Sequence, residues 1–544
     1  MDKDCGNVRK AVTNLSRTRN MFVNEGGTGM KTRIAMLLCA GAACASMAFC
    51  GPAGAAAQAK SGQGTILPGD GENAAKILTI FEGISQVPRC SKHEDAISEW
   101  LLGWAKEHGL AAKADAHRNV LVSVPASKGF ESRPAVVLQA HMDMVCQKTD
   151  DSAHDFGRDP ITLVREGEWL RADKTTLGAD DGMGIALALA LAEDTAHPHP
   201  PLELLFTTDE EVDMSGAFGL SKDFFTGRRF INIDSENDDT VTIGSAGGVK
   251  SVITMPLAFS ALDKGSTVLS LRIDGLLGGH SGVEIHKNRA NANALVAEAL
   301  SGPIPLRLAD FSGGTADNAI TRTAEAVFAL SPDHLDALKK RLAAFEQDVR
   351  TRFPDEKQLA LTLVPAAKAP ARVIPEADSA RVVRLIADIP QGVHEWSKQL
   401  PGLPETSNNI GVVRVEGDTL TIIAFQRSFS PQKLEDIAAG IEAAAARAGA
   451  VSKRRSTFPT WPPNPESNLY KKSLATYEAL FKTPMKTEII HAGLECGYVA
   501  ESFAGMEIIS IGPTMENVHT PRERVHVPSL ERVSAFLQAL LKDL

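Results

Sequence analysis

The stretch AVVLQA at residues 135–140 is followed directly by HMD at residues 141–143. A short, nearly continuous apolar run of this kind is typical of a strand that is buried on both faces. Residues 184–193 are rich in Ala and Leu and predict a helix, and residues 202–206 predict a second strand. A strand, a helix and another strand in this order favour parallel pairing through a right-handed crossover. The stretch therefore indicates an α/β fold.

The same alternation continues on both sides of this unit. Residues 95–108 place apolar side chains on one helical face, and residues 230–233 predict a further strand. Near the C-terminus, residues 508–511 predict a strand and residues 529–544 an amphipathic helix. Between about residues 252 and 425, β-branched alternating stretches are separated by long helical patterns. We therefore expect an α/β domain with a mixed, mostly parallel sheet flanked by helices, interrupted by an inserted α+β domain.

The limits of these domains follow from where the patterns change. We expect the first part of the α/β domain at residues 69–247 and its second part at residues 444–544. The inserted domain, which would serve as a lid and dimerisation domain, is expected at residues 248–443.

Residues 1–59 have the features of a leader. The apolar run at residues 34–49 is shorter than the about 20 residues that a membrane-spanning helix needs. It follows Lys31 and Arg33 and precedes a stretch of small residues, an order typical of a secretory signal peptide. The true start is then expected at Met30. This predicts a periplasmic or secreted protein with no membrane span in the mature chain. If the run is instead a buried N-terminal helix, we expect a cytoplasmic protein.

Composition narrows the class of partner. The chain has 544 residues, of which 43% are hydrophobic and 23% charged, as in ordinary globular proteins. Its formal net charge of −10 argues against non-specific binding of nucleic acid and against attraction to anionic lipid. Outside the leader the cysteines are Cys90, Cys146 and Cys496. Because they are so widely spaced, we expect small buried hydrophobic side chains rather than a disulfide framework.

Acidic and histidine side chains follow the predicted strands. His141 and Asp143 lie at positions i and i+2 after the first strand, so their side chains face the same way. A metal-bound imidazole usually donates its other N–H to a carboxylate, although an H-x-D pair alone also fits an ordinary surface pair. Three further acidic motifs and one histidine lie near other element ends: LGADDGMG at residues 177–184, TTDEE at residues 207–211, NIDSE at residues 232–236, and His519.

Together these motifs predict a metal centre. Ligand sites in open α/β sheets lie beyond the carboxyl ends of the strands, and the five motifs are expected there. Two imidazoles and several carboxylates suit zinc, and zinc pairs about 3.5–4 Å apart recur in hydrolases. Two such ions would balance the carboxylates of Asp180, Glu211 and Asp234 and one bridging hydroxide. Taken alone, the turn at residues 177–184 fits equally well a helix N-terminus that an Asp caps.

The motif series resembles that of the M20 family of co-catalytic zinc peptidases, in particular its aminoacyl-histidine (Xaa-His) dipeptidase branch. The resemblance runs from about Gly69 to the C-terminus, with the motifs in the same order. It implies an α/β catalytic domain with a lid, and hydrolysis of short unblocked peptides, Xaa-His dipeptides among them. The motifs are HMDMV, TLGADDGMG, TTDEEVDMSGA, INIDSE, GLLGGHSG, GGTADNAITR and GPTMENVHTPRE.

The resemblance assigns the metal ligands. Asp180 would bridge two Zn²⁺ ions per subunit, with Co²⁺ or Mn²⁺ as alternatives, and its peptide bond to the next residue would be cis. Glu211 and His519 would bind the first ion with Asp180. His141 and Asp234 would bind the second.

Further roles follow from the same resemblance. Asp143 would orient the imidazole of His141, and Glu210 would be the general base that moves a proton from water to the leaving amine. His280 would stabilise the oxyanion, across a dimer interface if the protein is a homodimer, although by itself it fits a turn histidine.

The small peptide substrate would be held by four other residues. Arg427 would pair with its terminal carboxylate, although a surface charge is the alternative for this arginine. Asn318 would also bind the substrate, and Gly493 and Glu495 would line the pocket.

Alternatives stay open for one residue and for the function. Where the family commonly has glycine after its two glutamates, this chain has Asp213, which is either a solvated loop residue or an influence on the site. Another M20-type aminopeptidase, an N-acyl amino acid deacylase and a catalytically silent metal- or peptide-binding protein remain alternative functions.

Overall fold

The predicted strands around residues 135–140 and 202–206 lie next to each other in a mixed sheet. The computed structural model describes residues 64–398 and 400–544, and within them eight strands form this sheet in the order β1-β2-β6-β3-β7-β21-β8-β20. Strand β3 pairs in parallel with β6 and with β7, β7 pairs in parallel with β21, and β8 with β20. The strands are β1 Ala111–Ala114, β2 Val120–Val124, β3 Val136–His141, β6 Leu202–Thr207, β7 Arg229–Asn232, β8 Thr240–Ser245, β20 Lys486–Ile490 and β21 Glu507–Ser510.

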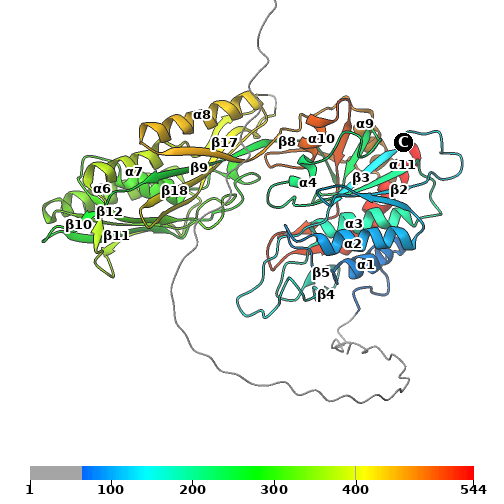
Figure 1. The fold of residues 1–544 in the computed structure, drawn as a ribbon, viewed down its shortest axis with the longest axis horizontal. Coiled ribbons are helices and arrows are strands. Elements are labelled where there is room, and N and C mark those ends of the chain that lie inside the picture. Colours follow the sequence, from blue (N-terminus) through cyan, green and yellow to red (C-terminus); the bar gives the residue numbers. More distant parts are fainter. Residues whose placement is uncertain (1–63, 399) are drawn as a thin grey trace, which may run out of the picture. The chain divides into compact units, whose positions relative to one another are not determined.

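Alternate side chains of β3 enter two different cores. Val136 and Leu138 belong to the core that the sheet shares with α1 Glu72–Ile84, α2 Asp95–Glu107 and α3 Ala179–Ala192, which lie on one side of the sheet (Figure 1). Val137 belongs to the core on the other side, with residues of α10 Cys496–Ser502. Because strand side chains alternate, His141 points to the same side as Val137.

The remaining elements of this domain are two long helices, a small sheet and a short helix. Helix α9 Asn468–Phe481 packs against β21, and α11 Val527–Asp543 packs against α1. A small sheet has the order β22-β23-β5-β4. The strands of this small sheet are β4 Leu163–Glu166, β5 Trp169–Ala172, β22 Met515–Glu516 and β23 Arg524–His526. A short helix, α4 Ser215–Phe218, follows the acidic loop after β6.

The inserted domain is a largely antiparallel sheet with helices. Its strands follow the order β14-β11-β13-β12-β17-β18-β9-β19, and β16 pairs with β17. Helices α6, α7 and α8 lie along one face of this sheet (Figure 1). The strands are β9 Gly247–Pro256, β11 Thr267–Asp274, β12 Arg307–Gly313, β13 Ala324–Leu330, β14 Ala360–Pro365, β16 Gly392–Trp396, β17 Pro404–Glu416, β18 Thr419–Ser428 and β19 Val451–Phe458. The helices are α5 Ala292–Leu300, α6 Leu335–Arg352, α7 Glu376–Asp388 and α8 Pro431–Arg447, with short elements β10 Ser260–Ala261, β15 Arg372–Val373, η1 Ile285–Lys287 and η2 Pro332–His334.

The predicted fold class is therefore confirmed: an α/β domain with an inserted α+β domain. Strand pairing bears on the expected C-terminal limit of the inserted domain, because β19 pairs with β9 in the inserted sheet. By strand pairing the insertion thus reaches Phe458, beyond the expected limit at residue 443. The expected limits at residues 69 and 247/248 stay predictions.

Two further predictions concern the N-terminal leader and membrane-spanning helices. The expected leader at residues 1–59, with its signal peptide and start at Met30, lies outside the described residues. Among the residues that are described, no helix combines the length and the apolar composition that a membrane crossing requires.

The prediction for the cysteines is wrong for two of the three. Cys90 and Cys146 form a disulfide with their Cα atoms 5.7 Å apart, whereas Cys496 is free and buried. Backbone pairing brings the two half-cystines together, because Met144 N donates to Arg89 O at 3.0 Å and Cys90 lies beside Met144 in a parallel bridge. A pairing across 56 residues leaves no trace in the local pattern of either segment.

We predict that the Cys90–Cys146 disulfide contributes measurably to stability. A disulfide restricts the unfolded chain and typically stabilises a protein by about 2–4 kcal/mol. The double variant Cys90→Ser/Cys146→Ser should therefore unfold at a lower Tm in calorimetry than the oxidised wild-type protein. Dithiothreitol should lower the Tm of the wild type and leave that of the double variant unchanged. Equal Tm values for the oxidised wild type and the double variant would contradict the prediction.

Candidate metal centre

All five predicted metal ligands converge beyond the carboxyl ends of three neighbouring strands. His141 is the last residue of β3, Glu211 follows β6 and Asp234 follows β7. Asp180 lies in the first turn of α3, and His519 lies in the loop between β22 and β23. The parallel register of β3 with β6 and β7 aligns these ends, so segments far apart in the sequence meet at one place.

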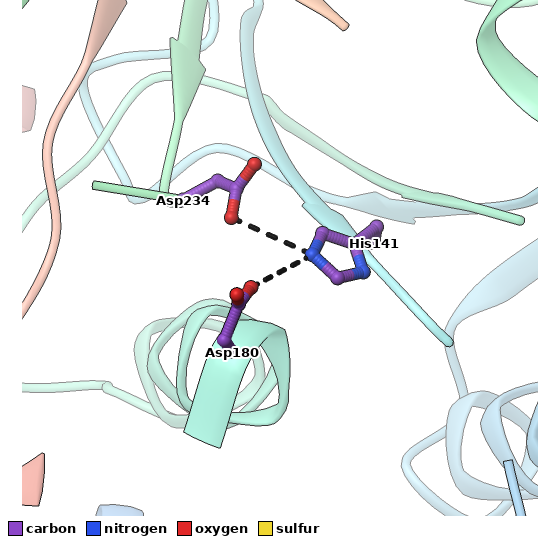
Figure 2. A group of neighbouring side chains, drawn as sticks. All are labelled: His141, Asp180 and Asp234. Atoms are coloured by element: carbon purple, nitrogen blue, oxygen red, sulfur yellow. Dashed lines mark hydrogen bonds and ion pairs between the residues drawn. The ribbon is translucent and has the colours of Figure 1, made fainter. Parts of the chain in front are cut away.

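His141, Asp180 and Asp234 form one group of candidate ligands. The Nε2 atom of His141 lies 2.9 Å from Oδ1 of Asp180 and 3.5 Å from Oδ1 of Asp234. Figure 2 shows both carboxylates directed at this one ring nitrogen. Three atoms of this kind within 4.8 Å of one another can hold a divalent cation.

A second group shares Asp180 with the first. The Nε2 atom of His519 lies 2.9 Å from Oδ2 of Asp180 and 2.9 Å from Oε2 of Glu211. Asp180 thus presents one carboxylate oxygen to each histidine. This arrangement suits a carboxylate that bridges two adjacent cations.

Asp143 supports both groups from behind. Its Oδ1 lies 3.3 Å from Nδ1 of His141, the ring nitrogen that faces away from Asp180. Its two carboxylate oxygens also accept hydrogen bonds from the backbone N–H groups of Glu210 (3.0 Å) and Glu211 (3.2 Å). One fully buried carboxylate therefore lies against the imidazole of His141 and holds the acidic loop that follows β6.

The carboxylates of Asp180, Glu211 and Asp234 repel one another unless a positive charge lies between them. Burial raises the pKa of Glu211 to about 7 and the pKa of Asp234 to about 6, and the negative charge of Asp180 adds to both shifts. Burial opposes ionisation of Asp180 as well, but hydrogen bonds with His141 and His519 lower its pKa below the ordinary value. The Oε1 atom of Glu211 is buried and has no hydrogen-bond partner among the described residues. This donor set fits divalent cations, which would supply the missing partner and the missing charge.

Glu210 lies beside these ligands. Its carboxylate forms a group within 4.8 Å with His141 and Glu211. Burial raises the pKa of Glu210 well above its ordinary value, so a proton on this carboxyl is easier to hold than on a solvated glutamate.

His280 is held as a neutral imidazole. Its Nδ1 accepts hydrogen bonds from the N–H groups of Gly282 and Val283, both at 3.2 Å, so the ring proton resides on Nε2. Burial, with the positive charge of Arg427, lowers the pKa of His280 to about 3. Gly282 packs so closely on this chain's own His491 that an added Cβ would lie 2.8 Å from the carbonyl oxygen of His491.

Arg427 is a buried cation, not a surface charge. It is 3% exposed, and its guanidinium lies over the ring of Phe425 at 4.0 Å from the centroid. Burial lowers its pKa to about 10, and the one acid that counteracts this shift is Asp317. Its Nε has no hydrogen-bond partner within the described parts of the chain.

The other predicted substrate residues are placed differently from one another. Asn318 is exposed, and its carbonyl accepts a 2.7 Å hydrogen bond from Ser281 N, next to His280. Gly493 packs on Phe458, where an added Cβ would lie 2.4 Å from a ring carbon. Glu495 is buried beneath the ends of β3 and β6. Its Oε2 accepts hydrogen bonds from Gln139 and Thr207. Burial raises the pKa of Glu495 to about 8.

Sequence reasoning missed two residues that shape the site. Glu523, 2% exposed, accepts hydrogen bonds from the N–H groups of residues 177–180 and so holds the turn that carries Asp180. Arg89 donates to the carbonyl oxygens of Met142 (3.1 Å) and Asp143 (3.0 Å). Glu523 lies inside one of the resembling motifs, four residues after His519, which was the available signal.

Asp213, which stands where the family commonly has glycine, forms its contacts outside the two ligand groups. Its carboxylate lies 3.0 Å from Nζ of Lys92 and accepts a 2.8 Å hydrogen bond from Ser456. It therefore pairs with a lysine at the rim of the loop and is not a member of either ligand group.

Comparisons with known proteins find similar sequences and folds. The sequence profile of Peptidase family M20/M25/M40 matches residues 137–543. The cytosol non-specific dipeptidase of Escherichia coli (strain K12) is 39% identical over 469 residues, which cover 86% of this chain and 96% of that protein. The crystal structure of aminoacylhistidine dipeptidase from Vibrio alginolyticus is similar with a TM-score of 0.74 at 35% identity, covering 86% of this chain and 96% of that one. Aminopeptidase PepT from Bacillus cereus ATCC 10987 shares the fold, with a TM-score of 0.50 at 16% identity over 86% of this chain and 98% of that one.

We predict that cation binding at this centre weakens as the pH falls. Below the raised pKa values of Glu211 and Asp234 these carboxyls carry protons that a cation has to displace. Lowering the pH from about 8 to about 5 should therefore reduce zinc affinity and the rise in Tm that zinc produces. Calorimetric titration at several pH values measures this. A zinc affinity independent of pH across this range would contradict the assignment of these ligands.

Proposed function

Because this chain belongs to peptidase family M20/M25/M40, we propose that it is a metal-dependent dipeptidase that cleaves short unblocked peptides, Xaa-His dipeptides among them. The names of the two most similar proteins described above support dipeptide hydrolysis. The observation that carries the proposal is the pair of ligand groups that share Asp180.

Two divalent cations, zinc by preference, are proposed to occupy the two groups. His141 and Asp234 would hold one cation, Glu211 and His519 the other, and Asp180 both. The chemistry that such a pair supplies when bound is polarisation of the peptide carbonyl and a lowered pKa of the attacking water.

Glu210 is proposed as the general base. Its carboxylate is next to the ligand groups, and the backbone N–H of Glu210 is fixed on Asp143. It would accept a proton from the attacking water and donate it to the amine that leaves. A pKa that burial raises above its ordinary value suits this double role, because the carboxyl must take up a proton from water before it releases that proton to the amine.

His280 is proposed to stabilise the oxyanion of the tetrahedral intermediate. A donor is required there, and the two N–H groups that bind Nδ1 leave the proton on Nε2. The loop of His280 lies against His491 of the same chain, and supply of this donor across a dimer interface is the alternative. The homodimer stays a prediction.

Arg427 is proposed to bind the terminal carboxylate of the peptide. Among the described residues, no carboxylate forms an ion pair with this buried guanidinium, and a buried guanidinium is stabilised when an anion reaches it. This role supports a substrate with a free C-terminus. Asn318, Gly493 and Glu495 stay predicted substrate residues.

We propose that the protein is exported, on two observations. The order of residues 31–59 is that of a signal peptide, and the Cys90–Cys146 disulfide suits an oxidising compartment. The name of the E. coli relative supports the alternative, a cytoplasmic protein.

Replacing Glu210 should separate metal binding from turnover. We expect Glu210→Gln to retain zinc, because Glu210 is not proposed as a ligand, and to lose about 10²–10⁴-fold in kcat. Zinc content and steady-state kinetics on one dipeptide measure the two effects. Asp213→Asn is the matched control, since this acid pairs with Lys92, and should keep nearly full activity. Unchanged turnover of Glu210→Gln would refute the general base.

A substrate panel tests the function as a whole. Carnosine, other Xaa-His dipeptides, Cys-Gly and N-acetyl amino acids should be offered to the protein with and without a chelator. We expect chelator-sensitive hydrolysis of unblocked dipeptides and little hydrolysis of N-acetyl amino acids. Preference for the N-acetyl compounds would favour a deacylase, and hydrolysis of none would favour a binding protein.

Fractionation of a bacterial host that expresses the full chain tests export. We expect periplasmic protein with an N-terminus near residue 59 and with Cys90 and Cys146 oxidised. An intact N-terminus in the cytoplasmic fraction would contradict it.

A further inference from the structure

Two buried side chains, Arg427 and His491, each have one nitrogen atom without a hydrogen-bond partner among the described residues. Arg427 and His491 are each 3% exposed. The Nε atom of Arg427 and the Nδ1 atom of His491 have no hydrogen-bond partner among the described residues. A buried polar atom without a hydrogen bond lowers the stability of the folded state. Two such atoms close together therefore indicate that a ligand binds there.

Ser407 links the two groups. Its hydroxyl lies 2.8 Å from Nε2 of His491. In the antiparallel ladder of β17 and β18, Ser407 is directly opposite Arg427, so their side chains stand on the same face as close neighbours. The ring of Phe429 also lies 5.5 Å from the imidazole, between centroids. The imidazole is thus held between a hydroxyl, an aromatic ring and the neighbourhood of the guanidinium.

The charge of this neighbourhood decides the kind of ligand. Burial and the positive charge of Arg427 lower the pKa of His491 to about 3, so the imidazole is neutral and carries one proton. A buried guanidinium next to it repels a second cation, which excludes a metal ion as the missing partner. An anion with two acceptor oxygens satisfies both groups. The C-terminal carboxylate of a peptide is such an anion.

We propose that His491 is a substrate-binding residue that donates a hydrogen bond from Nδ1 to the terminal carboxylate of the peptide, beside Arg427. Ser407 is a positioning residue that donates its hydroxyl proton to Nε2 and so leaves the ring proton on Nδ1. This inference rests on the proposed function, since it assigns a further residue to the same substrate. It makes the site selective for peptides that end in a free carboxylate at this position.

Two variants of His491 separate the two ring nitrogens. Glutamine places its amide near the Nε2 position and lacks a group at Nδ1, whereas asparagine places its amide near the Nδ1 position. The assay compares the kinetics of a dipeptide that has a free C-terminal carboxylate with those of its C-terminal amide. We expect His491→Gln to lower kcat/KM for the free dipeptide about tenfold or more, mainly through KM, because a charge-assisted hydrogen bond is lost. The amide should change less than about twofold, and His491→Asn should lose less than His491→Gln on the free dipeptide.

Two further variants complete the test. Ser407→Ala should reduce the preference for the free carboxylate in the same direction, and it does so without removing the imidazole. His197→Gln is the matched control, since His197 is an exposed histidine of the same α/β domain that pairs with Asp194 at 2.7 Å, and it should leave both substrates unchanged. Losses of equal size on the free dipeptide and the amide would overturn the inference, and so would a wild-type KM for His491→Gln.

A binding measurement keeps the inference separate from the activity. Calorimetric titration with free L-histidine, a product of Xaa-His cleavage, should show tighter binding to the wild type than to His491→Gln. Equal affinities would overturn the role of His491. A wild-type protein that hydrolyses none of the peptides would overturn the proposed function, and the titration would still decide the inference.

Discussion

The carboxylate of Asp180 is the constraint on which the rest of this centre depends. Each of its oxygens faces a different histidine, so a single side chain joins two ligand groups. That geometry exists only while the turn before α3 is held in place, and Glu523 holds it by accepting hydrogen bonds from consecutive backbone N–H groups. Since burial of a carboxylate is costly, this cluster of acids is stable where positive charge compensates it.

The two halves of the site have opposite electrostatic character. Around Asp180 the side chains are acidic and suit cations, whereas around Arg427 they are neutral imidazoles beside one buried cation. A dipeptide has matching chemistry, since its scissile carbonyl needs an electrophile and its terminal carboxylate needs a cation. Burial and the positive charge of Arg427 lower the pKa values of His280 and His491. Both imidazoles therefore stay neutral and do not repel the guanidinium.

Support for the centre comes from chain segments behind the ligands. Arg89 ties the carbonyl groups of residues 142 and 143 to the segment that carries Cys90, and the disulfide closes that segment on Cys146. The imidazole of His141 thus lies against the carboxylate of Asp143, a residue whose backbone carbonyl is bound by Arg89. Precise placement of ligands requires such support, because a misplaced ligand weakens a cation site sharply.

The sequence by itself determined the α/β fold, the inserted domain and the strand-end position of the acidic and histidine motifs. These are local signals: the apolar run before His141, the i, i+2 spacing to Asp143, and acids that follow a strand at once. Only the tertiary structure decided the Cys90–Cys146 disulfide, the place of β19 in the inserted sheet and the contact of Ser407 with His491. Such contacts join segments many residues apart, and neither partner changes the periodicity or composition of its own segment, so nothing local records them.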